Sequence, residues 1–132
     1  MSPILLDTNV VSVIFKTNHP LRPAALDATD GHELYIAFMT KAEVLVWPMN
    51  NDWGARRRAE LSEHLSEFTT LLPDEDSPRY WAEVIATSKR LGRPMDAADA
   101  WIAATALQWD LPLVTNNFRD FEPLSELTLV RI

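Results

Sequence analysis

Acidic residues stand at three separated places in the sequence where an apolar segment ends or a helix is expected to begin. Asp7 follows an apolar run in ILLDTNVVS, Glu43 lies in TKAEVL, and Asp96 and Asp99 lie in DAADAW. Hard divalent cations prefer carboxylate oxygens as ligands. Carboxylates that converge repel one another unless protons or metal ions compensate their charge. If the fold brings these side chains together, the chemistry they offer is that of a divalent-cation site.

Each of these acids also has a purely structural explanation. The pattern Thr40-x-x-Glu43 is that of a capping box, in which the glutamate bonds back to the threonine amide. Asp96 and Asp99 can cap the helix that follows, and both suit the positive end of a helix dipole. Asp7 has no helix to cap except the one directly after it. The residues alone therefore leave both explanations open.

An alternation of short apolar runs and helical patterns must position these acids. We expect strands at residues 3–7, 33–38, 69–73, 111–115 and 127–132. Helices are expected at residues 8–15, 22–29, 40–49, 52–68, 77–91 and 96–110, of which the one at 77–91 has the clearest end signals, Ser77, Pro78 and Gly92. This alternation predicts an α/β fold with a five-stranded parallel sheet covered by helices on both faces.

The predicted fold gathers the acids at one edge of the sheet. In such folds the carboxyl ends of strands and the amino ends of helices share an edge, and ligands bind there. Asp7, Glu43, Asp96 and Asp99 all fall on that edge, together with the segment TNNFRD at residues 115–120. Joint placement favours a binding site over four independent helix caps.

Composition limits the function further. The 132 residues suggest a single domain spanning residues 1–132, and the absence of cysteine excludes disulfides and thiolate metal sites. The net charge of -7 is unlike that of a nucleic-acid binder, unless bound cations or a basic partner offset it. MSPILLD is not a signal peptide, and no apolar run could span a membrane, so we expect a cytoplasmic protein without a membrane partner.

Two other phosphoryl-transfer classes also place an Asp after the first strand. A haloacid-dehalogenase-type hydrolase requires Asp-x-Asp, but position 9 is Asn. A response-regulator receiver requires a lysine after a late strand, but no lysine follows Lys89. Both classes are therefore disfavoured.

The segments LLDTNVVS, TKAEVL, DAADAWIAATAL and LVTNNFRDFE resemble, in order and spacing, the signature segments of PIN-domain ribonucleases. The likeness is greatest to the VapC-type toxins of bacterial toxin–antitoxin pairs and spans residues 4–122. It implies a three-layer α/β/α sandwich around a mainly parallel sheet. It also implies an endoribonuclease that depends on Mg²⁺ or Mn²⁺ and cleaves RNA with metal-activated water.

The resemblance also assigns roles to residues. The three family acids match Asp7, Glu43 and Asp99. The fourth metal-site position falls on Asn117, and Asp120 three residues later could contribute through water. Supporting polar positions match Asn9, Asp96 and Thr115.

Partners follow from the same resemblance. We expect an RNA substrate, for which Arg93 is the candidate phosphate contact, and a cognate antitoxin, for which Trp47 and Trp53 are candidate contacts. A homodimer through the later helices, including residues 77–91, is also expected. The alternative is a PIN-like module that binds RNA or protein without cutting, and the uncharged Asn117 favours that reading.

Overall fold

Five parallel strands form the centre of the molecule in the computed structural model, which describes residues 2–132. The strands are β1 (Pro3–Leu6), β2 (Glu33–Ala37), β3 (Thr69–Leu71), β4 (Leu113–Thr115) and β5 (Leu129–Arg131). Their order in the sheet is β3-β2-β1-β4-β5, and every neighbouring pair is parallel. The predicted five-stranded parallel sheet is therefore confirmed, and the strand order reverses between β1 and β4, where such folds bind ligands.

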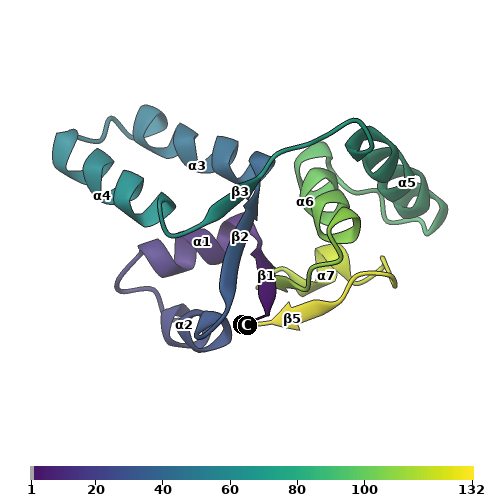
Figure 1. Cartoon of the computed structure of the whole chain (residues 1–132), viewed down its shortest axis with the longest axis horizontal. Coiled ribbons are helices and arrows are strands. Elements are labelled where there is room, and N and C mark those ends of the chain that lie inside the picture. The colour runs from purple at the N-terminus through teal and green to yellow at the C-terminus, as the bar shows by residue number, and fades with distance from the viewer. Residues whose placement is uncertain (1) are drawn as a thin grey trace.

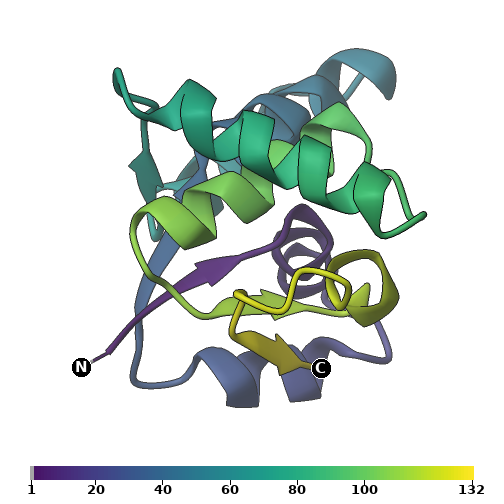
Figure 2. The same ribbon diagram turned by 90° about the vertical axis from the view of Figure 1, so that its right-hand side faces the viewer.

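Within residues 2–132, seven helices cover the two faces of this sheet. On one side lie α1 (Thr8–Phe15), α2 (Arg22–Thr29), α3 (Phe38–Asn50) and α4 (Ala55–Leu65), and on the other lie α5 (Ser77–Arg90), α6 (Ala97–Gln108) and α7 (Phe118–Phe121) (Figure 1). Figure 2 shows α5 and α6 stacked over the strands from the side. The predicted three-layer α/β/α sandwich is confirmed.

Successive side chains of the central strand, β1, point to opposite faces of the sheet. This strand therefore contributes to both hydrophobic cores. Ile4 and Leu6 pack into the cluster under α1 to α4, whereas Leu5 packs into the cluster under α5 to α7. Leu113 and Val114 of β4 divide in the same way. Because these strands are buried on both faces, their sequences are continuous apolar runs rather than alternating ones.

Helix boundaries depart from the sequence expectation. Helix α4 begins and ends three residues inside the expected range 52–68. The second strand ends at Ala37 and α3 begins at once, so Thr40 lies inside the first turn and the predicted N-cap is wrong. Helix α5 has Asp76 at its N-cap, one residue before the predicted Ser77. The four-residue α7 was not predicted, because so short a segment shows no helical period.

The predicted end of α5 is correct. Gly92 follows the helix with a φ of 72°, a conformation that glycine adopts without a steric penalty. This helix is the longest of the described elements at 14 residues. No helix within residues 2–132 has the length and apolar character needed to cross a membrane.

Candidate functional site

Asp7 sits where the strand order reverses. Its backbone N–H donates to the Val114 carbonyl at 3.0 Å, which continues the β1–β4 ladder by one step. The register of that ladder pairs Leu5 with Leu113, and two residues further on it sets Asp7 opposite Thr115. The Thr115 hydroxyl donates to Asp7 Oδ2 at 2.9 Å, and both residues are buried. Two adjacent strands thus fix this carboxylate at the switch point.

Burial changes the acidity of Asp7. Loss of hydration is the largest cause, and together with the smaller effects of the charges of Glu43 and Asp120 it raises the pKa of the Asp7 carboxyl to about 6. The hydroxyl of Thr115 and the backbone N–H of Thr8 act in the opposite direction, since both stabilise the ionised form. A carboxylate with so few partners is poised to bind a proton or a cation near neutral pH.

The two acids of DAADAW play different parts at the start of α6. Asp96 is the N-cap, and its Oδ1 accepts the Asp99 backbone N–H at 2.8 Å, so the capping explanation holds for Asp96. Asp99 lies in the first turn of α6. The pKa of its carboxyl is raised to about 7, mainly by burial and to a smaller extent by the charges of Asp96, Asp7, Asp120 and Glu43. Asp96, Asp99 and Asp120 also line one pocket.

Glu43 does not form the predicted capping box. It lies in α3, and its Oε1 accepts a hydrogen bond from the Thr8 hydroxyl at 2.8 Å. The same hydroxyl lies 3.0 Å from that of Thr40, which is fully buried. Capping is therefore not the role of Glu43, and its side chain is directed towards the residue that follows Asp7.

The segment after β4 brings Asp120 into the same region. Asn117 takes part through its backbone, whose N–H donates to the Thr115 hydroxyl at 2.9 Å. Asp120 lies in α7, and its charge raises the pKa of both Asp7 and Asp99. Asp120 therefore belongs to the group of acids whose charges act on one another.

A pocket of about 300 Å³ opens beside these acids. Its lining includes Arg93, Asp96, Asp99 and Asp120. The Arg93 guanidinium forms an ion pair with Glu122 at 3.2 Å and donates to the Arg119 carbonyl. These two contacts tie the segment before α6 to α7.

Sequence reasoning missed three polar residues of this region. Thr8 and Thr40 support Glu43, and the side-chain oxygen of Asn116 is buried with no hydrogen-bond partner among residues 2–132. Thr8 follows Asp7 directly and Asn116 precedes Asn117, so their places in the motifs were the available signal. Asn9 is exposed on the surface of α1.

The donor set fits a hard divalent cation. Asp7, Glu43, Asp99 and Asp120 offer carboxylate oxygens, and their mutual repulsion is what such an ion would relieve. In the conformation described, no three Asp, Glu or His side chains of residues 2–132 are close enough to hold one metal ion. A cation would therefore have to draw these carboxylates closer together.

Comparison with known proteins agrees with this geometry. The model of the PIN domain family matches residues 4–126. Ribonuclease VapC1 of Haemophilus influenzae is 27% identical over 93% of this chain and 92% of its own length. Toxin FitB of Neisseria gonorrhoeae is 32% identical over 89% and 90%. A toxin-antitoxin complex from Klebsiella pneumoniae contains a chain that superposes with a TM-score of 0.72 at 25% identity, covering 98% of this chain and 99% of that one. The chain therefore belongs to the PIN domain family.

Proposed function

We propose that this protein is a metal-dependent endoribonuclease and the toxin of a toxin–antitoxin pair. The observation that carries the proposal is the placement of four carboxylates around the switch point of a PIN domain. Asp7 is buried there and held by Thr115, Glu43 accepts a hydrogen bond from the adjoining Thr8, and Asp99 and Asp120 line one pocket. The names of two relatives, Ribonuclease VapC1 and Toxin FitB, support RNA as substrate and toxicity as outcome.

In this proposal Asp7, Glu43, Asp99 and Asp120 hold Mg²⁺ or Mn²⁺, and Asn117 is the alternative fourth ligand. When bound, the ion would lower the pKa of water and stabilise the negative charge that develops on the attacking and leaving oxygens.

Neighbouring residues complete the proposed site. Thr115 fixes the orientation of Asp7 by its hydrogen bond, and Asp96 fixes the start of the helix that carries Asp99. Asn9, two residues after Asp7 in the sequence, is exposed and is proposed as a supporting residue. The Arg93 side chain is 45% exposed at the acidic pocket and is our candidate contact for an RNA phosphate.

We expect the purified chain to cleave single-stranded RNA when Mn²⁺ is present and to leave it intact when EDTA is added in excess. Direct attack by water on phosphorus needs no ribose 2′-hydroxyl, so the products should carry a 3′-hydroxyl. Gel analysis of a labelled oligonucleotide, with end-group mapping, measures both features. A 2′,3′-cyclic phosphate would contradict the mechanism, and intact RNA with Mn²⁺ would favour the non-catalytic module.

A partner surface is proposed where aromatic side chains gather between α1, α3 and α4. Phe15 stacks on Trp53 with ring centroids 5.8 Å apart, Trp47 lies 6.4 Å from Phe15, and the Arg57 guanidinium covers Trp53 at 4.2 Å. Leu45, Val46 and Met49 expose apolar surface on the adjoining helix α3. Since the Klebsiella pneumoniae neighbour is a toxin-antitoxin complex, we assign this surface to an antitoxin.

Replacing Trp53 by alanine should weaken the complex with the antitoxin while leaving RNA cleavage intact. A tryptophan that anchors an interface typically contributes about 2 kcal/mol or more to binding. The product of the neighbouring reading frame is the probe, and surface plasmon resonance measures its affinity.

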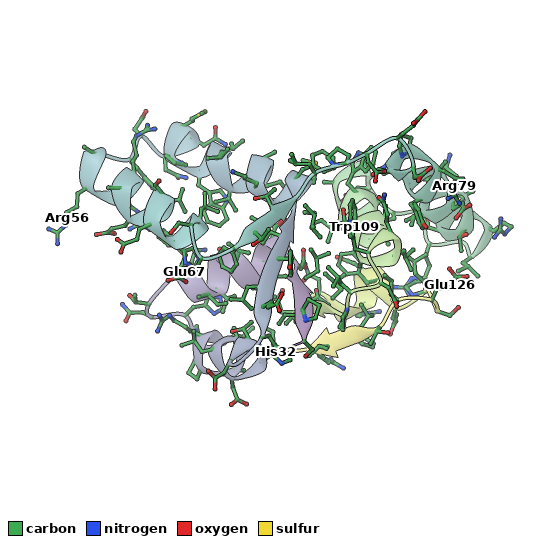
Figure 3. All side chains as sticks on the ribbon, in the orientation of Figure 1. His32, Arg56, Glu67, Arg79, Trp109 and Glu126 are labelled. Carbon is green, nitrogen blue, oxygen red and sulfur yellow. The ribbon has the colours of Figure 1, made fainter. Side chains whose placement is uncertain are left out.

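Trp109→Ala is the matched control, because Trp109 is a half-buried tryptophan on the side of the sheet that α6 covers (Figure 3). Equal affinities for the wild type and Trp53→Ala would place the partner elsewhere.

A second copy of the chain is also proposed to bind, through the later helices. Leu91, at the end of α5, is 53% exposed and offers apolar surface for that contact. An RNA substrate and an antitoxin made by the same cell would together place the protein in the cytoplasm.

A further inference from the structure

A pair of threonine hydroxyls connects Glu43 to the start of α1. Thr8 Oγ1 lies 2.8 Å from Glu43 Oε1 and 3.0 Å from Thr40 Oγ1. A hydroxyl has one proton to donate, and a carboxylate can only accept. The Thr8 proton therefore goes to Glu43, and the Thr40 hydroxyl donates to Thr8. A hydrogen bond to an ionised carboxylate is stronger than one between neutral groups, so the bond from Thr8 to Glu43 is the stronger of the two.

The buried hydroxyl of Thr40 is used differently from those of other helical threonines. Thr29 and Thr105 donate to the carbonyl four residues earlier in their own helices, at 2.9 and 2.8 Å. Thr40 is the third residue of α3, and the residue four positions before it lies in β2. Its hydroxyl has no such carbonyl in its own helix and instead reaches across to α1.

Glu43 depends on its contact with Thr8 more than Asp7 depends on its contact with Thr115. Asp7 is buried and fixed by two strands, whereas Glu43 is half-buried and has a longer, more flexible side chain. Among residues 2–132, the Thr8 hydroxyl is the only hydrogen-bond donor that the structure gives to the Glu43 carboxylate. Without it, the side chain would sample several rotamers.

We propose that Thr8 is a positioning residue that, supported by the Thr40 hydroxyl, holds the Glu43 carboxylate beside Asp7. Two consecutive residues thus contribute to the site: Asp7 provides one carboxylate, and Thr8 holds the carboxylate of Glu43 by a hydrogen bond. The benefit to metal binding rests on the function proposed above, whereas the positioning itself does not.

The test compares Thr8→Val, which keeps the shape of the side chain but removes the hydroxyl, with Thr8→Ser, which keeps the hydroxyl. Side-chain carbon NMR of Glu43, recorded in EDTA, reports its rotamer order without any metal. We expect one fixed rotamer in the wild type and Thr8→Ser, and averaging in Thr8→Val. Thr40→Val should show a partial loss of order. A fixed Glu43 side chain in Thr8→Val would overturn the proposal.

Calorimetric titration with Mn²⁺ gives the functional readout. Loss of a group that orients a metal ligand typically lowers metal affinity about 10- to 100-fold, and we expect a decrease in that range for Thr8→Val. In a Glu43→Ala background, Thr8→Val should cause no further decrease. A decrease of equal size in that background would show that Thr8 acts through the general fold and would overturn the proposal. If the wild type bound no Mn²⁺ while the NMR result held, the proposed function would fail and the positioning role would stand.

Discussion

Asp7→Asn is expected to lose RNA cleavage by more than about a hundredfold, beyond the 10- to 100-fold that is typical when a group only supports a metal ligand. Asparagine is close in shape to aspartate and still offers an oxygen to the Thr115 hydroxyl, which now bonds Asp7 Oδ2 at 2.9 Å. It removes only the charge at the switch point. The initial rate of cleavage of a labelled oligonucleotide, with Mn²⁺ present, measures the loss.

The control for that experiment is Asp27→Asn, which removes an exposed carboxylate on α2. It changes the net charge of the protein by the same amount as Asp7→Asn but lies outside the acidic site. It should therefore cleave RNA at the wild-type rate. Circular dichroism must show that Asp7→Asn remains folded. A folded Asp7→Asn protein with wild-type activity would rule out Asp7 as part of the active site.

Asp99 and Asp96 should respond to substitution in opposite ways. Asp99→Asn is expected to lose cleavage by more than about a hundredfold, by the same reasoning as for Asp7. Asp96→Ala removes the N-cap of α6, which typically costs about 0.5–2 kcal/mol of stability, and should keep most of the activity. Cleavage rates and urea unfolding, measured on both variants, separate the two roles. Equal losses of activity would mean that the wrong acid of the pair was assigned to the site.

The pH dependence of stability adds a second signature for Asp99. Its pKa is about 7 in the folded protein against an ordinary 3.8, so between these values the folded state holds a proton that the unfolded state has released. The contribution of this group to stability is therefore present below about pH 4 and is lost as the pH rises towards 7. With EDTA present, Asp99→Asn should match the wild type near pH 4 and be more stable near pH 7. A constant difference between the two proteins would contradict the raised pKa.

The sequence predicted the sheet and the place of Asp7 at its edge, because both depend on signals that are local or topological. PILL is apolar at every position, as expected for a central strand buried on both faces, and Asp7 stands directly at its end. The cap at Asp96 was equally visible, because a cap and its helix are neighbours in sequence.

The details of Glu43 could not be predicted from its neighbours. The Thr40-x-x-Glu43 pattern suggested a capping box, but α3 begins two residues before Thr40, and Thr8, 35 positions before Glu43, provides its hydrogen bond. Such a contact exists only after β1 and β2 have paired and brought α1 beside α3. The raised pKa of Asp7 and Asp99 likewise follows from burial, which no local pattern reports.

We propose above that the acids at the switch point bind a divalent cation. Isothermal titration of Mn²⁺ into the wild type and into Asp7→Asn, at pH 7.5 in a chelator-free buffer, tests it most directly; the pH lies above the raised pKa values of about 6 and about 7, so protons compete little. The wild type should bind Mn²⁺ with measurable heat, and Asp7→Asn should bind far more weakly. Unchanged Mn²⁺ affinity in Asp7→Asn would contradict the claim.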